Sequence, residues 1–167
     1  MSEGRTALVA GSFDPLTNGH LDIILRAQAL FGRVVVAVLV NPGKSPLLAL
    51  DDRLAIVRAC AEGVPGVEVV AFDGLLVDAA RRHGATVVVR GLRSVSDYEH
   101  EWPMAKMNAA LLPGLETVFL SAAAEWAHVS STLVRQIDAM GGAIETFVPP
   151  AVSAHLRRRT QALAEEG

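Results

Sequence analysis

One short segment carries most of the residue types that could handle a phosphate group. Residues 11–20 read GSFDPLTNGH, in which Gly11 lets the backbone approach a ligand and Ser12 supplies a hydroxyl and an amide. His20 falls in the first turn of an expected helix, and a helix N-terminus favours anions through its free N–H groups and its dipole. This pattern favours phosphate chemistry over the alternative, a strand-to-helix turn with a capping histidine.

Three further segments carry cations or hydroxyl groups. Residues 41–45 (NPGKS) form no P-loop because Val38 replaces its leading glycine, but Lys44 can still meet a phosphate as a point charge. Residues 90–93 (RGLR) offer two arginine forks that match phosphate oxygens. Residues 126–135 (WAHVSSTLVR) place three hydroxyl groups at the start of an expected helix, with an arginine one turn on. Taken singly, these segments could also be surface charge or an ordinary N-cap.

The sequence gives little support for a metal site formed by the protein's own side chains. The acidic segment 97–101 could bind ribose hydroxyls, a metal or only water. Residues 100–104 (HEWPM) match the zinc-protease pattern for four positions, but Met104 stands where the second histidine must be. Cys60 is the only cysteine, which excludes a disulfide framework and a cysteine-rich zinc site and favours a reducing compartment. We therefore expect no dedicated metal site.

The elements that must position these residues follow from alternating sequence periods. Strands are expected at residues Thr6–Ala10, Val34–Val40, Val67–Phe72, Thr86–Val89 and Thr117–Leu120. Helices are expected at Asn18–Phe31, Asp51–Ala61, Leu75–His83, within Val95–Leu112, and at Ser130–Met140 and Val152–Glu165. This alternation predicts an α/β fold, a single-domain, doubly wound, five-stranded parallel sheet, whose ligands bind beyond the carboxyl ends of the strands.

Local patterns give further expectations about the helices. Leu21, Ile24, Leu25 and either Gln28 or Leu30 are expected to lie on one side of the first helix. Asp51 is expected to be the N-cap of the second helix, and Pro103 to start, kink or break the fourth. The run 157–159 (RRR) is expected to be the solvated face of the closing helix.

Length, composition and charge exclude several classes of protein. A chain of 167 residues should bury roughly 70% of its unfolded surface, and 51% hydrophobic residues are too many for a disordered chain. The longest apolar run, Val34–Val40, has seven residues, whereas a membrane span needs about 20. The N-terminus also lacks the pattern of a signal peptide. A formal charge of −3 argues against a duplex nucleic-acid surface, so any bound polyanion should be small.

Together the motifs resemble the nucleotidylyltransferase superfamily. GSFDP and TNGH within residues 11–20 resemble its T/H-x-G-H motif, and residues 129–135 (VSSTLVR) resemble its second motif, I-S-S-S-x-x-R. Thr17 in place of the first histidine, Lys44, the RGLR segment and the acidic run to Glu101 are similar to bacterial phosphopantetheine adenylyltransferases over nearly the whole chain.

This resemblance implies a Rossmann-like nucleotidylyltransferase fold and a specific reaction. ATP and 4′-phosphopantetheine would give dephospho-coenzyme A and pyrophosphate, the penultimate step of coenzyme A biosynthesis. The phosphate of the acceptor would attack the α-phosphorus in line, so no protein nucleophile is needed. Mg²⁺ would be carried by the ATP phosphates. The resemblance also implies a cytoplasmic homohexamer, and it leaves feedback by coenzyme A open.

The resemblance also assigns roles to single residues. His20, Lys44 and Arg90 would be catalytic, with His20 on the non-bridging oxygens of the transition state and Lys44 and Arg90 on the attacking phosphate. Ser12, Lys44, Leu76 and Arg90 would bind the acceptor, Leu76 at its pantetheine arm. The residues implied to bind ATP are Ser12, Phe13, His20, Gly91, Leu92, Arg93, Glu101, Trp126, Ala127, His128, Val129, Ser130, Ser131 and Thr132.

The chain departs from the family pattern at three positions. Thr132 replaces the third serine, His128 stands where relatives usually carry an aromatic residue, and His100 where they usually carry tyrosine. Two other functions remain in competition, a sister enzyme acting on nicotinamide mononucleotide or glycerol phosphate, and a nucleotide-binding regulatory module without chemistry. A dinucleotide-binding dehydrogenase is excluded because the first turn contains no G-x-G-x-x-G.

Overall fold

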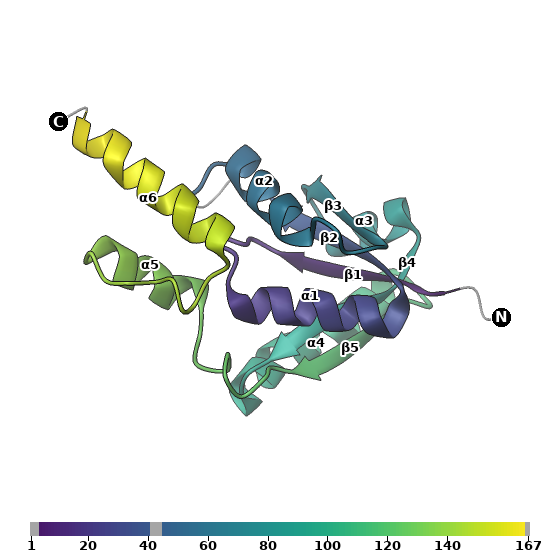
Figure 1. Ribbon diagram of the computed structural model, residues 1–167. Coiled ribbons are helices and arrows are strands. Elements are labelled where there is room, and N and C mark those ends of the chain that lie inside the picture. Colours follow the sequence, from purple (N-terminus) through teal and green to yellow (C-terminus); the bar gives the residue numbers. More distant parts are fainter. Residues whose placement is uncertain (1–3, 41–44, 166–167) are drawn as a thin grey trace.

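Strands and helices alternate along the chain in a computed structural model that describes residues 4–40 and 45–165 (Figure 1). The strands are β1 (Thr6–Gly11), β2 (Arg33–Leu39), β3 (Val67–Phe72), β4 (Ala85–Leu92) and β5 (Glu116–Ser121). The helices are α1 (Asn18–Phe31), α2 (Leu50–Ala61), α3 (Leu76–His83), α4 (Val95–Leu111), α5 (Ser131–Ala139) and α6 (Pro150–Glu165). Within these residues the strands form a parallel sheet of order β3-β2-β1-β4-β5.

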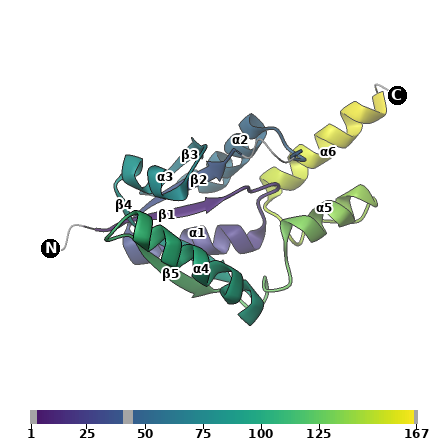
Figure 2. The same ribbon diagram turned by 180° about the vertical axis from the view of Figure 1, so that it is seen from behind.

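Successive residues of the central strands face opposite layers of the molecule. In β2, Val34, Val36 and Val38 pack in one core with side chains of α1, α2, α5 and α6, whereas Val35 and Ala37 pack in a second core with α3. This two-sided burial explains why the strand is apolar at every position. Figures 1 and 2 show α1 and α2 on one face of the sheet and α3 and α4 on the other. The prediction of a doubly wound, five-stranded parallel sheet is confirmed.

The position of β1 determines where a ligand can bind. The chain passes from β1 to β2 and β3 on one side and then returns to β4 on the other, so β1 and β4 flank a change of winding direction. At such a point the loops diverge and leave a crevice at the carboxyl edge of the sheet. Helices α5 and α6 lie beyond this edge (Figure 1). No helix of residues 4–40 and 45–165 is long and apolar enough to cross a membrane.

Most elements agree with the sequence-based prediction to within three residues at each end. β4 is longer than predicted, because Arg90, Gly91 and Leu92 continue to pair with β5 instead of forming a loop. These three residues therefore have fixed backbone positions at the edge of the crevice.

The local expectations for three helices need correction. The residue before α2 is Ala49, which caps without a side-chain hydrogen bond, so the prediction of Asp51 as N-cap is wrong and Asp51 lies in the first turn. In α1 the buried residues are Ile23, Ile24 and Ala27, and Leu25 and Leu30 are exposed. The packing face is thus turned from the predicted one, because α1 lies over Gly91 with Ile23 against it. Helix α4 runs through Pro103, so this proline neither starts nor breaks the helix, and the expected kink stays a prediction.

Candidate active site

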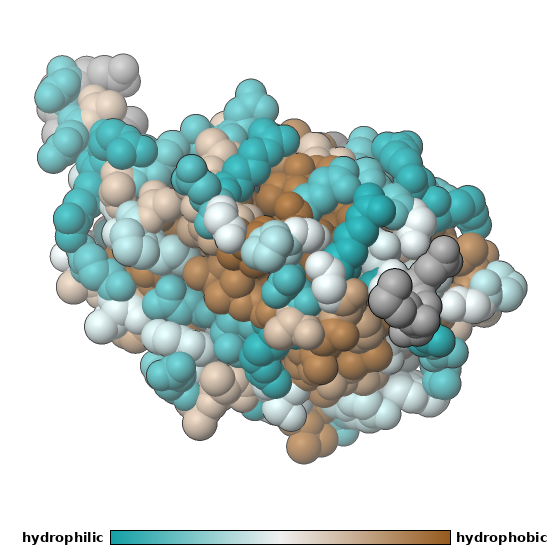
Figure 3. Space-filling view, turned by 45° about the vertical axis from the view of Figure 1, so that its right-hand side comes forward, coloured by the Kyte–Doolittle hydropathy of each residue, from teal (hydrophilic) through white to brown (hydrophobic). Residues whose placement is uncertain are grey.

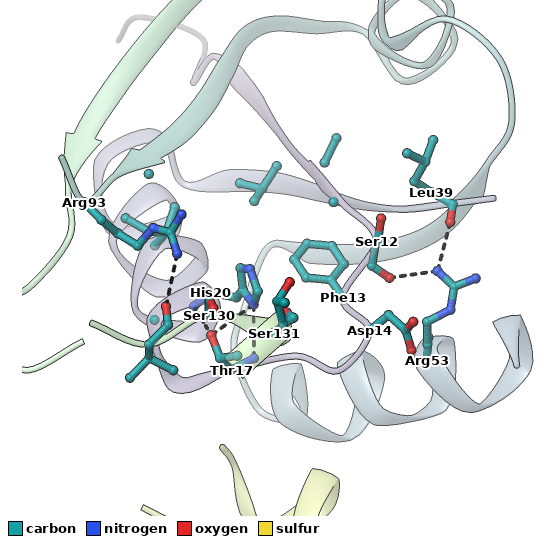
Figure 4. A pocket seen from close by; sticks show the side chains of 18 of the residues that line it. Ser12, Phe13, Asp14, Thr17, His20, Leu39, Arg53, Arg93, Ser130 and Ser131 are labelled. Atoms are coloured by element: carbon teal, nitrogen blue, oxygen red, sulfur yellow. Dashed lines mark hydrogen bonds between the residues drawn. The ribbon is translucent and has the colours of Figure 1, made fainter. Parts of the chain in front are cut away.

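A cavity of about 980 Å³ lies at the carboxyl edge of the sheet, beside β1 and β4 (Figure 4). Its volume is near the upper end of the range for small-molecule sites. The residues implied by the resemblance that line it are Ser12, Phe13, His20, Arg90, Gly91, Arg93, Glu101, Trp126, Val129, Ser130, Ser131 and Thr132. The fold therefore brings together segments that are more than a hundred residues apart in the chain.

Some implied site residues lie elsewhere. Leu92, Ala127 and Leu76 are partly buried but are not among the described residues that line the cavity, and Leu76 packs against the core of α3. His128 is also outside the lining and meets Phe147 edge-on, with ring centroids 6.1 Å apart. The prediction for Lys44 concerns a position outside the described residues.

Asp14 anchors the turn between β1 and α1. Its buried carboxylate accepts hydrogen bonds from the backbone N–H groups of Leu47 and Leu48, each at 2.8 Å. Arg135 of α5 donates to the same carboxylate at 3.2 Å and to the Asp14 carbonyl at 3.0 Å. One carboxylate thus ties three segments together around the cavity. Spacing along the chain does not reveal this role, because the partners of Asp14 lie 33 to 121 positions away.

His20 and Thr17 form a reciprocal cap at the start of α1. The Thr17 hydroxyl oxygen accepts from the His20 backbone N–H at 3.3 Å, and His20 Nδ1 accepts from the Thr17 backbone N–H at 3.1 Å. Because Nδ1 accepts a hydrogen bond, the proton of the neutral imidazole is on Nε2. The ring also packs edge-on against Phe13, whose centroid is 5.4 Å away. The capping and the functional interpretation of His20 are therefore compatible.

The same environment keeps His20 uncharged. Burial, together with the positive charges of Arg93 and Arg90, lowers the pKa of His20 to about 4. At neutral pH His20 is therefore a hydrogen-bond donor through Nε2 and does not carry a positive charge. Figure 4 shows its ring between Arg93 on one side and Phe13 on the other.

The two arginines of the RGLR segment are held by acidic partners from α4. Arg90 makes a bidentate pair with Glu101, at 2.8 and 2.6 Å, and donates to the Ala10 carbonyl at 2.8 Å. Arg93 donates through its side chain to Asp97 at 3.0 and 3.2 Å, and these bonds hold the pKa of Asp97 below its usual range. The acidic segment thus positions the arginines, a role that its sequence did not reveal.

The start of α5 provides backbone donors at the cavity. The Ser130 hydroxyl is the N-cap and accepts from the Leu133 N–H at 3.2 Å, while the Ser131 hydroxyl donates to the Pro15 carbonyl at 2.8 Å. Both hydroxyl groups therefore serve the fold. The backbone amides of Ser131 and Thr132, in the first turn, are the groups that a helix N-terminus presents to an anion.

Two arginines of the lining were not recognisable from the sequence as site residues. Arg53, which is 4% exposed, donates to the carbonyl oxygens of Leu48, Ser12 and Leu39 at 3.2, 2.7 and 2.9 Å. Arg157, Arg158 and Arg159 of α6 are exposed, as expected for the solvated face of this helix, but Arg159 also lines the cavity. No local pattern distinguishes these arginines from surface charges, since their places depend on how α2 and α6 pack.

Comparisons with known proteins agree with this geometry. Residues 8–137 match the cytidylyltransferase-like family. A phosphopantetheine adenylyltransferase of Alkalilimnicola ehrlichii is 52% identical over 155 residues, covering 92% of this chain and 89% of the relative. Another, of Thioalkalivibrio sulfidiphilus, is 51% identical over 153 residues, covering 92% and 96%. The chain belongs to the phosphopantetheine adenylyltransferase family. The motif-based resemblance is thus confirmed.

A solved structure supports the fold of this phosphopantetheine adenylyltransferase family member. A crystal structure from Vibrio parahaemolyticus, described under the name nicotinate-nucleotide adenylyltransferase, superposes with a TM-score of 0.67 at 18% identity. The match covers 93% of each chain. At this identity the likeness concerns the fold alone, and it confirms the expected nucleotidylyltransferase architecture.

Proposed function

We propose that this chain transfers the adenylyl group of ATP to the phosphate of 4′-phosphopantetheine, forming dephospho-coenzyme A and pyrophosphate in the penultimate step of coenzyme A biosynthesis. The observation that carries the proposal is a neutral histidine donor beside two fixed arginines, in a chain about half identical to named phosphopantetheine adenylyltransferases. The proposed reaction needs such a site because negative charge accumulates on the non-bridging oxygens around the α-phosphorus.

The bonds that change in this reaction lie entirely in the substrates. An oxygen of the acceptor phosphate forms a bond to the α-phosphorus, while the bond from that phosphorus to the bridging oxygen of pyrophosphate breaks. His20 Nε2–H donates a hydrogen bond to a non-bridging oxygen of the α-phosphoryl group. His20 can do so throughout the reaction without exchanging its proton, because its pKa is about 4. Catalysis then consists of positioning and charge stabilisation.

ATP occupies the part of the cavity between β4 and α5 in this proposal. The amides of Ser12 and Phe13 and the start of α5 bind its phosphates. The base and triphosphate lie along residues 126–132, with Gly91 to Arg93 on the opposite wall. Leu92, Ala127 and His128 lie outside the lining as described, so their contacts with the nucleotide would require rearrangement or backbone groups.

The acceptor phosphate is bound by Lys44 and Arg90 in this proposal, with Ser12 nearby and Leu76 along the pantetheine arm. Arg90 suits this role because, among the described residues, its bonds to Glu101 and the Ala10 carbonyl leave one N–H of each terminal nitrogen unused. Its guanidinium is therefore fixed in orientation before the substrate arrives.

Mg²⁺ would enter with ATP, on whose phosphates it offsets negative charge. The cavity carboxylates Asp14, Asp97 and Glu101 each already bond to an arginine, so they are poor candidates for direct metal ligands. Within residues 4–40 and 45–165 no group of three His, Cys, Asp or Glu side chains could hold a metal ion.

A homohexamer is part of the same proposal. Helix α4 exposes large apolar side chains on opposite faces, as expected for a helix covered by further subunits. These side chains are Val95, Tyr98, Trp102, Met104, Met107 and Leu111. Figure 3 shows hydrophobic side chains also reaching the surface in patches on the face that it displays. Light scattering of the purified protein tests this assembly.

Two further expectations concern the location of the protein in the cell and its regulation. A cytoplasmic location fits a chain whose single cysteine, Cys60, is free and partly buried. Feedback by coenzyme A is open, and it is tested by adding coenzyme A to the assay below.

The deciding experiment follows pyrophosphate release from ATP and magnesium with one acceptor at a time. Release with 4′-phosphopantetheine alone supports the proposed reaction. Release only with nicotinamide mononucleotide or glycerol phosphate would retain the chemistry but change the acceptor. Binding of ATP with no release from any acceptor would instead favour a regulatory module. A His20→Ala variant serves as the negative control.

A further inference from the structure

The charges around the cavity are not balanced. Among its described lining residues there are five arginines and three carboxylates. Glu101 pairs with Arg90, Asp97 with Arg93, and Asp14 with Arg135. Two arginines, Arg53 and Arg159, have no carboxylate partner within the described part of the chain.

Arg53 is a buried positive charge whose hydrogen bonds within the described part of the chain all go to carbonyl oxygens. Its guanidinium holds together the first turn at Ser12, the end of β2 at Leu39, and the loop at Leu48. Carbonyl oxygens accept from its Nε and Nη1 but do not cancel its net charge, and a buried charge is ordinarily paired. Arg53 therefore gives its end of the cavity a positive potential. Figure 4 shows it on the side of Phe13 away from Arg93.

Arg159 reaches the same cavity from α6. This helix is anchored by Val152 and Leu156, which are buried in the core, and His155 lies 3.6 Å from Asp52 at the start of α2. Arg159 follows His155 by four residues and so lies on the same helix face, toward α2. Arg157 faces differently, since it pairs with Glu145.

We propose that Arg159 binds a phosphate group of a substrate at the mouth of this cavity, where the field of the buried Arg53 already attracts an anion. This inference rests on the proposed function, because it concerns the substrates of that reaction. A flexible exposed arginine at a cavity mouth can close on a phosphate with a charge-assisted, bidentate hydrogen bond. The phosphate could belong to the nucleotide or to the acceptor, and the two sources are separated below.

The test compares three variants of the full chain. Arg159→Ala removes both the positive charge and the guanidinium that makes bidentate hydrogen bonds, whereas Arg159→Lys keeps the charge. Arg158→Ala is the control, because it removes the charge of an exposed neighbour outside the lining. Calorimetry measures binding of inorganic tripolyphosphate and, separately, of 4′-phosphopantetheine to each protein. Melting temperatures without ligand check that all three variants fold.

We expect Arg159→Ala to lose affinity on the order of tenfold for one of these two ligands, while Arg158→Ala stays close to the parent. Loss for tripolyphosphate assigns the contact to the nucleotide, and loss for 4′-phosphopantetheine assigns it to the acceptor. Arg159→Lys should recover part of the affinity. The KM for the corresponding substrate should rise in parallel.

Unchanged affinity for both ligands in Arg159→Ala overturns the inference. Equal losses in Arg158→Ala and Arg159→Ala overturn it as well, because they would indicate only a general charge effect. The proposed function fails differently, if the parent protein releases no pyrophosphate. In that case the two calorimetric measurements still decide whether Arg159 contacts an anion.

Discussion

The arginines on the two sides of the cavity differ in whether they have a carboxylate partner. On the β4 side, Arg90 and Arg93 are paired with Glu101 and Asp97, whereas on the α2–α6 side Arg53 and Arg159 have no carboxylate partner in the described chain. A carboxylate fixes the orientation of a guanidinium and offsets its charge. The β4 side is therefore organised before a substrate arrives, and the α2–α6 side keeps positive charge available for one.

The pKa of His20 responds to the positive charges on the β4 side of the cavity. Arg93 and Arg90 are close enough to lower its pKa in spite of their carboxylate partners. The pKa of His20 is thus a local measure of charge that can be followed by NMR. A change in this pKa therefore distinguishes a loss of charge on the β4 side from a loss of charge on the α2–α6 side.

The largest effect is expected from His20→Ala. Because His20 supplies a neutral donor to the α-phosphoryl oxygens, kcat should fall on the order of 10²–10³-fold, as when one oxyanion donor is removed, while ATP still binds. Steady-state kinetics and calorimetry measure the two quantities. Since Ala also removes the cap on the Thr17 N–H, a melting curve checks the fold. Turnover at the parent rate would remove His20 from the mechanism.

Arg53→Met should have the next largest effect, on stability. Three carbonyl oxygens lose their donor in a buried place, so the free energy of unfolding should fall on the order of 2–4 kcal/mol. Urea denaturation measures this change. Arg158→Ala, at an exposed position, is the control and should stay within about 0.5 kcal/mol of the parent. Equal stability of Arg53→Met and the parent would show that the carbonyl contacts contribute little.

Glu101→Gln should weaken the organisation of the β4 side without removing a positive charge. Arg90 loses its bidentate carboxylate, and we expect kcat/KM for the acceptor to fall on the order of tenfold. Glu99→Gln is a matched control, because Glu99 is exposed on the same helix. If both variants behaved like the parent, the Arg90–Glu101 pair would have no role in positioning the acceptor.

The smallest expected effect is a change in the pKa of His20. Arg93→Met removes one positive charge and should raise this pKa from about 4 toward 6.5, with burial still keeping it below 6.5. Arg159→Ala, on the other side of the cavity, should leave it unchanged. NMR titration of the His20 ring, assigned with a His20→Asn variant, measures both. A similar rise in the two variants would contradict the difference between the sides.

The same shift predicts how acid affects stability. The folded state holds His20 with a pKa of about 4, whereas the unfolded chain has about 6.5. As pH falls, the unfolded state binds the proton first, so this contribution to stability is complete above about pH 6.5 and is lost between about 6.5 and 4. Urea denaturation at several pH values should therefore show a shallower decline for His20→Asn in this window. An unchanged slope would contradict the lowered pKa.

Much of the fold and of the site was predictable from local sequence. The β-branched runs predicted the strands, and the motifs at residues 11–20 and 129–135 predicted which loops border the cavity. Errors occurred where a neighbour decides the outcome, as for the packing face of α1, which depends on Ile23 meeting Gly91. Capping at Ala49 rather than Asp51 is a local choice that the sequence left undetermined.

The sequence by itself determined the layer architecture and the chemical groups at the site, because hydrophobic periodicity and turn residues act over a few positions. Only the tertiary structure decided which arginines are paired and which are not. Arg53 bonds to Ser12 from 41 positions away, and Arg135 bonds to Asp14 from 121 positions away. Electrostatic partners are set by distance in space and by burial, and neither can be obtained from spacing along the chain.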